Sequence, residues 1–128
     1  MTSEKFRELV EEALRGIPKH FRDAMKNIAI VVEDEASPEQ LAEVDIAPPD
    51  TLLGLYEGTP ITERQWDDGN RLPDKITLFQ YAIEDASGND EDVVVAIGET
   101  LIHEIGHYFG LSEDEIEAIE EEYWRANE

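Results

Sequence analysis

Apolar residues recur at helical spacing at the start of the chain. Residues 3–16 place an apolar side chain at every third or fourth position, which predicts an amphipathic helix. Ser3 can cap the start of this helix and Gly16 can end it. Pro18 suits the first turn of a helix, so we expect a second, shorter helix from there to Met25.

Three β-rich segments occupy the middle of the chain. Residues 28–32 are mostly β-branched and predict a buried strand. Residues 51–56 predict a second strand, and residues 75–81 predict a third because polar and apolar positions alternate as far as Leu78. Ile83 either extends the third strand or opens an irregular link.

The connections between these segments carry turn residues. Residues 34–50 are expected to be mostly loop, although Ser37-Pro38-Glu39-Gln40 can start one helical turn. Residues 57–60 and Asp67-Asp68-Gly69-Asn70 predict turns before the third strand.

Helical spacing returns in the last third of the chain. One apolar stripe predicts a long helix, although Val93-Val94-Val95 by itself favours a strand. Asn89 can cap this helix, and the acidic residues 90–92 suit the positive end of its dipole. The stripe consists of Val94, Ile97, Leu101, Ile105 and Phe109.

A final helix is expected from Ser112, which forms a capping-box pattern with Glu115. Its inward side should carry Ile116, Ile119, Tyr123 and Trp124, and its exposed side should carry Glu117, Glu120, Glu121 and Glu122. The whole order of elements predicts one small α+β domain over residues 1–128.

Charge and composition restrict the partners. The net charge is −22, and residues 28–128 hold only four basic side chains against twenty-seven acidic ones. Such a surface repels nucleic-acid phosphate and anionic lipid, so we expect neither partner. A basic protein partner is compatible with it, and solubility or adaptation to high salt explains it more simply.

The chain has no cysteine, which rules out disulfides and thiolate metal sites. It also has no apolar signal region at its N-terminus and no apolar run long enough to span a membrane. We therefore expect a cytoplasmic protein.

The segment His103-Glu104-Ile105-Gly106-His107 carries the clearest chemical signal. On a helix, the spacing of four residues puts both imidazoles on one face, one turn apart, where they can bind a single ion. This is the H-E-x-x-H pattern of zinc peptidases, in which the glutamate is the general base. The pattern predicts a Zn²⁺ site with Glu104 as the catalytic residue.

Two histidines alone hold zinc weakly, so a third ligand is needed. Gly110 can end the helix and let the chain turn back, which would bring Glu113 toward the ion. Asp114 and the pair Glu121/Glu122 remain alternatives. The third histidine, His20, lies in a basic stretch and is expected at the surface.

The predicted chemistry is metal-assisted hydrolysis of a peptide or protein substrate. Glu104 would take a proton from water and deliver it to the leaving amine. The hydroxyl group of Tyr56, Tyr81 or Tyr108 is a candidate for an oxyanion or substrate contact. An extended peptide would pair with an edge strand of the sheet, for which residues 75–81 are the candidate.

The sequence from Thr100 to Glu115 resembles the signature of the small bacterial minimal zincin-like metallopeptidases, and residues 53–58 and 72–79 resemble further segments of that family. The resemblance covers most of the chain. It implies a compact zincin-like domain, with a small mixed sheet of three to four strands and an active-site helix. It also implies zinc held by His103, His107 and an acidic residue, with Glu104 as base.

The chain differs from the larger metzincin group. Metzincins usually have histidine at the position of Glu113 and a methionine turn downstream, but the only methionines here are Met1 and Met25. Two other interpretations stay open. The domain is either a zincin-fold module that binds metal or protein without hydrolysis, or an acidic protein that binds basic partners.

Overall fold

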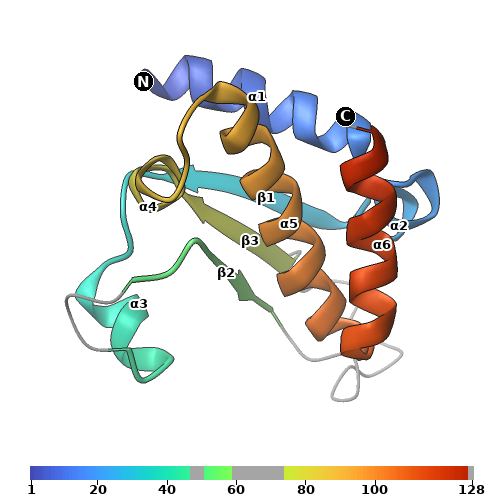
Figure 1. The fold of residues 1–128 in the computed structure, drawn as a ribbon. Coiled ribbons are helices and arrows are strands. Elements are labelled where there is room, and N and C mark those ends of the chain that lie inside the picture. Colours follow the sequence, from blue (N-terminus) through green and yellow to red (C-terminus); the bar gives the residue numbers. More distant parts are fainter. Residues whose placement is uncertain (47–50, 59–73, 127–128) are drawn as a thin grey trace.

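The computed structural model describes residues 1–46, 51–58 and 74–126, which form six helices and three strands (Figure 1). The predicted turn at residues 67–70 and the second half of the turn predicted at 57–60 lie outside these ranges. In chain order, the elements are α1 (Ser3–Gly16), α2 (Lys19–Ala24), β1 (Ile28–Glu33), α3 (Pro38–Glu43), β2 (Gly54–Glu57), β3 (Asp74–Phe79), α4 (Gln80–Asp85), α5 (Asp90–Tyr108) and α6 (Glu113–Ala126).

The strands form a mixed sheet in the order β1-β3-β2, which confirms the predicted α+β class. β1 runs parallel to β3, with Ile28 opposite Asp74, and β2 runs antiparallel to β3, with Gly54 opposite Leu78. The expectation that residues 75–81 form an edge strand is therefore wrong. Thr77 explains the error, because this polar residue is 0 % exposed and the strand is buried on both faces.

Four local predictions also change. Gln80–Asp85 forms α4, so the third strand stops at Phe79, and Ile83 faces the core from a helix. β2 begins only at Gly54. Thr2 caps α1 in place of Ser3, since its side chain accepts a hydrogen bond from the backbone N–H of Lys5. Residues 38–43 form a complete short helix rather than one turn, started by a capping box between Ser37 and Gln40.

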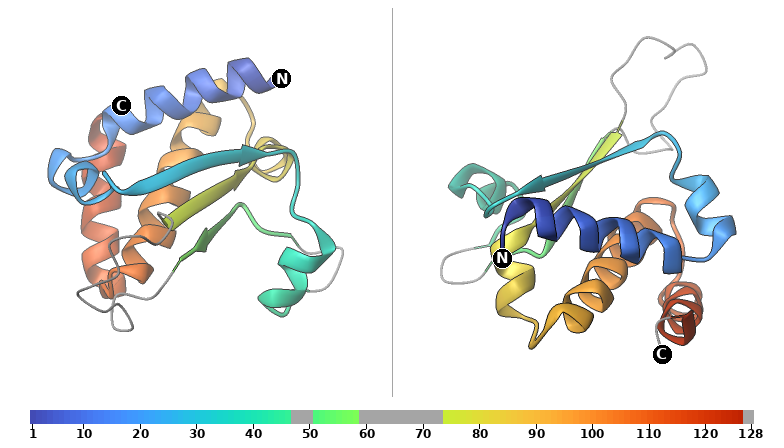
Figure 2. Two further views of the ribbon diagram at one scale, coloured as in Figure 1. Left: turned by 180° about the vertical axis from the view of Figure 1, so that it is seen from behind. Right: turned by 90° about the horizontal axis from the view of Figure 1, so that it is seen from above.

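Helices α1, α5 and α6 lie on one side of the sheet, with α6 beside α5 (Figures 1 and 2). The core lies between α1, α5 and the sheet, where Phe6, Ile76, Leu78, Ile97 and Leu101 are each fully buried. None of the helices described is both long enough and apolar enough to cross a membrane.

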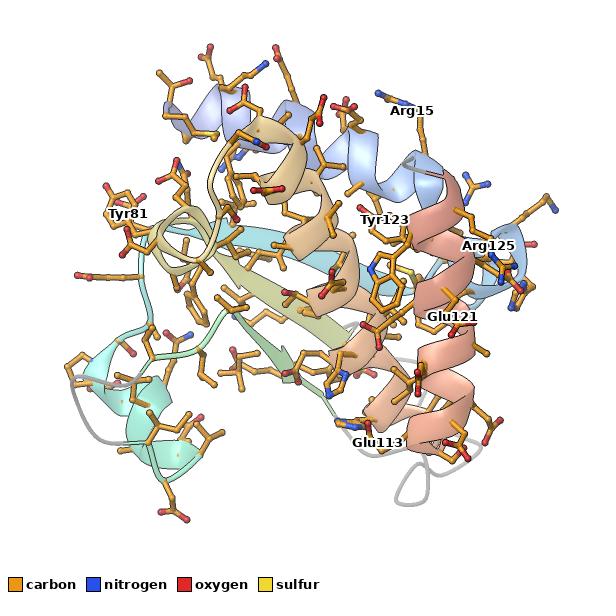
Figure 3. The ribbon with its side chains drawn as sticks, in the orientation of Figure 1. Arg15, Tyr81, Glu113, Glu121, Tyr123 and Arg125 are labelled. Carbon is orange, nitrogen blue, oxygen red and sulfur yellow. The ribbon has the colours of Figure 1, made fainter. Side chains whose placement is uncertain are left out.

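α6 is fixed against α5 by Tyr123, which points from α6 toward α5 (Figure 3). The Tyr123 hydroxyl donates a hydrogen bond to the carbonyl oxygen of Val94. Gly98 makes this contact possible, because a Cβ atom there would overlap the Tyr123 ring. The predicted place of Trp124 on the inward face is wrong, since this side chain is 39 % exposed.

Candidate metal centre

Helix α5 carries both histidines of the motif near its C-terminal end. Its start is fixed as predicted, since the Asn89 side chain accepts a hydrogen bond of 2.9 Å from the backbone N–H of Asp92. The β-branched run from Val93 is helical because Val93 and Val94 are buried against the core. The rings of His103 and His107 lie one turn apart, with their centroids 4.3 Å from each other.

The chain reverses directly after this helix. Gly110 has a φ of +77°, and its N–H donates to the carbonyl of His107 at 3.0 Å. The N–H of Leu111 donates to the carbonyl of Gly106 at 3.0 Å, which completes a Schellman motif. The predicted helix end at Gly110 is confirmed.

A capping box then starts α6. The Ser112 hydroxyl accepts from the N–H of Glu115 at 3.2 Å, and the N–H of Ser112 donates to the Glu115 carboxylate at 3.1 Å. Glu113 is therefore the first residue of α6, and its carboxylate returns toward the end of α5 (Figure 3).

His103, His107 and Glu113 form a group whose ligand atoms all lie within 4.8 Å of one another. The Glu113 carboxylate is 2.7 Å from Nε2 of His107. Among the described residues, Asp114, Glu121 and Glu122 do not belong to this group. Tetrahedral zinc with ligand bonds of about 2.0–2.2 Å places its donor atoms about 3.3 Å apart. The nitrogen and oxygen donors therefore fit zinc after small side-chain movements.

Two carboxylates near the histidines have opposite electrostatic environments. The hydrogen bond from His107 lowers the pKa of exposed Glu113, and the charges of both histidines act in the same direction. Burial raises the pKa of Glu104, and the charges of His103 and His107 oppose this shift. Glu113 is thus held ionised, whereas Glu104 holds a proton more readily than an exposed glutamate.

A cleft of about 560 Å³ opens beside this group. His103 and Glu104 line one end of it, and the cleft follows α5 back to Asp92. Residues 51–54, just before and at the start of β2, form another part of its wall, and Glu120 reaches it from α6. The motif residues thus face a space large enough for a substrate side chain.

Two acidic residues of this cleft do not stand out in the motif. Glu99 lies four residues before His103, so helical spacing alone places it on the face of the motif. Glu120 was expected on the exposed side of the last helix, but it is half-buried and lines the cleft. No local sequence pattern indicates its position, which depends on how α6 packs on α5.

The three candidate tyrosines fall in different places. Tyr56 and Tyr108 stack with their ring centroids 4.1 Å apart, and the Tyr56 hydroxyl donates to the buried Asp74 carboxylate at 2.7 Å. Because Tyr108 follows His107, this pair lies at the same end of α5 as the group of His103, His107 and Glu113. Tyr81 lies on α4, on the opposite side of the fold from Glu113 (Figure 3), so the structure does not bring it to the group.

A mixed sheet, an H-E-x-x-H helix packed on it, and two imidazoles that converge with a carboxylate are the features of metal-dependent peptidases. The family model of zincin-like metallopeptidases matches residues 25–123, and the chain belongs to this family. Membership implies zinc binding and peptide substrates. No curated protein matches the chain.

Proposed function

We propose that the protein is a zinc-dependent peptidase in which His103, His107 and Glu113 hold the metal and Glu104 is the general base. One observation carries the proposal. Three donor atoms lie within 4.8 Å of one another at the end of α5, next to a half-buried glutamate that faces a cleft. A solvent-exposed helix face would not need three converging donor atoms, and a simple ion pair would not need a half-buried glutamate at a cleft beside it.

A zinc ion at this position would polarise the carbonyl group of a peptide and make water easier to deprotonate. The Glu104 carboxylate would accept the proton of the attacking water while the water oxygen bonds to the carbonyl carbon. When the C–N bond breaks, the same carboxyl group would deliver the proton to the amine nitrogen. The burial that raises the Glu104 pKa makes this carboxylate a stronger base.

The substrate would bind between α5 and the segment that leads into β2. Among the strands of residues 1–46, 51–58 and 74–126, β2 lies at an edge of the sheet, and edge strands can pair with the backbone of an extended peptide. Residues 51–54 line the cleft together with the face of α5 that carries Glu104. A peptide that follows β2 would therefore present its backbone and side chains to the motif.

The test combines zinc analysis with cleavage. Purified protein is expected to bind one equivalent of zinc and to cleave members of a random peptide library. Glu104→Gln should abolish cleavage while the zinc content stays the same. Glu91→Gln, which removes one charge from an exposed position of the same helix, should retain both properties.

Each outcome separates two functions. Zinc binding without any cleavage that depends on Glu104 would replace the peptidase proposal with a zinc-dependent binding module. Failure to bind zinc at micromolar concentration would contradict the metal centre itself, and with it both functions.

A further inference from the structure

The cleft has an apolar wall beyond its catalytic end. Leu53 lines it although 37 % of this residue is exposed, and Val95 and Ala96 line it from α5. An exposed leucine at the mouth of a cleft offers a contact surface for the apolar part of a ligand.

Two carboxylates face the same space from different helices. Glu99 comes from α5 and Glu120 from α6, and both line the cleft. The indole N–H of Trp124 donates to the Glu99 carboxylate at 3.0 Å, which restrains this side chain at the cleft. Within residues 1–46, 51–58 and 74–126, no lysine or arginine forms an ion pair with either glutamate.

The two carboxylates lie close enough to affect each other. Burial and then the charge of Glu99 raise the pKa of Glu120. A cationic group placed between them would be attracted by both, whereas an acidic group would be repelled.

We propose that this cleft binds a lysine or arginine side chain of the peptide substrate, close to the bond that is cleaved, and that Glu99 and Glu120 select it. The inference rests on the proposed peptidase function. A long basic side chain suits this lining, because its aliphatic stem can pack on the apolar wall while its charged end contacts Glu99 and Glu120. The position selected lies near the cleaved bond because His103 and Glu104 line the same cleft.

The experiment compares fluorogenic peptides that differ at one position near the cleaved bond. Lysine, arginine, norleucine and glutamate are placed in turn at each flanking position, and kcat/KM is measured with the zinc-loaded protein. Lysine or arginine is expected to exceed norleucine by about tenfold at one position. Glutamate is expected to be the poorest residue there.

Variants separate the cleft from the general negative charge of the protein. Glu99→Gln and Glu120→Gln should each lower the ratio of lysine to norleucine by about fivefold. Glu91→Gln removes the same charge from α5 outside the cleft and should leave the ratio unchanged. Glu120→Lys should abolish the preference for lysine, because the new ammonium group repels a basic side chain and neutralises Glu99.

Three results would overturn the inference. They are cleavage without a preference at any position, a preference for lysine at every position, and a preference that Glu91→Gln lowers as much as Glu120→Gln does. If no peptide is cleaved, the proposed function fails by itself. The cleft is then tested by fluorescence anisotropy with zinc-loaded Glu104→Gln protein. The inference is supported if the Glu104→Gln protein binds lysine peptides more tightly than norleucine peptides and the double variant Glu104→Gln/Glu120→Gln loses this difference. Equal binding of both peptides by the Glu104→Gln protein would contradict it.

Discussion

The contact between α5 and α6 allows a quantitative prediction for Gly98→Ala. Gly98 is buried in the middle of α5, and a Cβ atom built there would overlap the ring of Tyr123. Tyr123 is 0 % exposed and is also held by its hydrogen bond to Val94, so its ring has little room to move. The substitution therefore forces two packed helices apart or displaces a buried aromatic ring.

Two opposing effects set the size of the change. Alanine is a better helix residue than glycine by about 1 kcal/mol, which would stabilise the protein if the site had space. Overpacking a core typically costs about 1–3 kcal/mol, and weakening the buried hydrogen bond of Tyr123 adds roughly 1 kcal/mol. The net expectation is a loss of about 1–3 kcal/mol in the free energy of unfolding.

Urea and thermal unfolding in EDTA would measure this loss without the stabilisation that bound zinc adds. The melting temperature should fall by roughly 3–15 °C, because each kcal/mol shifts it by about 3–5 °C in a chain of this size. Gly106→Ala is the comparison variant, because it makes the same exchange in the same helix, but its Cβ meets Cγ1 of buried Ile116 at 2.8 Å and not a hydrogen-bonded aromatic ring. Its loss of stability should be smaller than that of Gly98→Ala. Gly98→Ala protein as stable as the wild type would refute the packing argument.

Further variants test the metal centre and its surroundings. Glu113→Gln should weaken zinc binding by at least about 100-fold, measured by competition with a chromogenic chelator. Loss of a residue that only supports a zinc ligand already weakens binding by about 10- to 100-fold. Glu121→Gln should leave the zinc affinity unchanged. If Glu121→Gln weakened zinc binding and Glu113→Gln did not, Glu121 would be the ligand instead. Burial and the charge of Glu99 raise the pKa of Glu120 in the folded state. At a pH above this pKa, the ionised Glu120 carboxylate therefore lowers the free energy of unfolding. Glu120→Gln should therefore stabilise the protein in EDTA at pH 7 by less than about 1 kcal/mol, and this gain should fade as the pH falls below the ordinary carboxyl pKa. A gain that persists at acidic pH would point to packing instead of charge. Gly110→Ala, at a φ of +77°, should cost about 1–2 kcal/mol in thermal unfolding, and Gly110→Asn less; equal losses would show that the left-handed backbone is not the cause.

The candidate metal-binding group of His103, His107 and Glu113 was predictable because its geometry is local. His103 and His107 share a helix face through their spacing, Gly110 supplies the positive φ that ends the helix, and the capping box of Ser112 fixes where α6 begins. The helix end at Gly110 and the helix cap at Ser112 leave the chain between His107 and Glu113 few conformations. Among the described residues, this reversal brings the Glu113 carboxylate to His107 and leaves Asp114 outside the group.

The sheet was less predictable because strand order depends on contacts between distant segments. Alternation of polar and apolar residues in 75–81 indicated one solvent-facing side, but Thr77 is fully buried in the central strand. A hydroxyl group counts as polar in any sequence pattern, whereas the fold treats this position as core. The same limit applies to Gln80, which is 2 % exposed at the start of α4.

Glu99 and Glu120 show why the substrate end of the cleft was the hardest part to foresee. For stability alone, two carboxylates that face each other in a partly buried space are unfavourable, and glutamine at position 120 would remove the repulsion. The proposed substrate explains this arrangement, because a cationic side chain between Glu99 and Glu120 would offset the repulsion between their carboxylates. The same substitution, Glu120→Gln, should thus raise stability and lower selectivity for lysine. Glu120 is therefore unfavourable for stability but useful for the proposed substrate selection. Its role can be recognised only once the fold shows that it lies near Glu99.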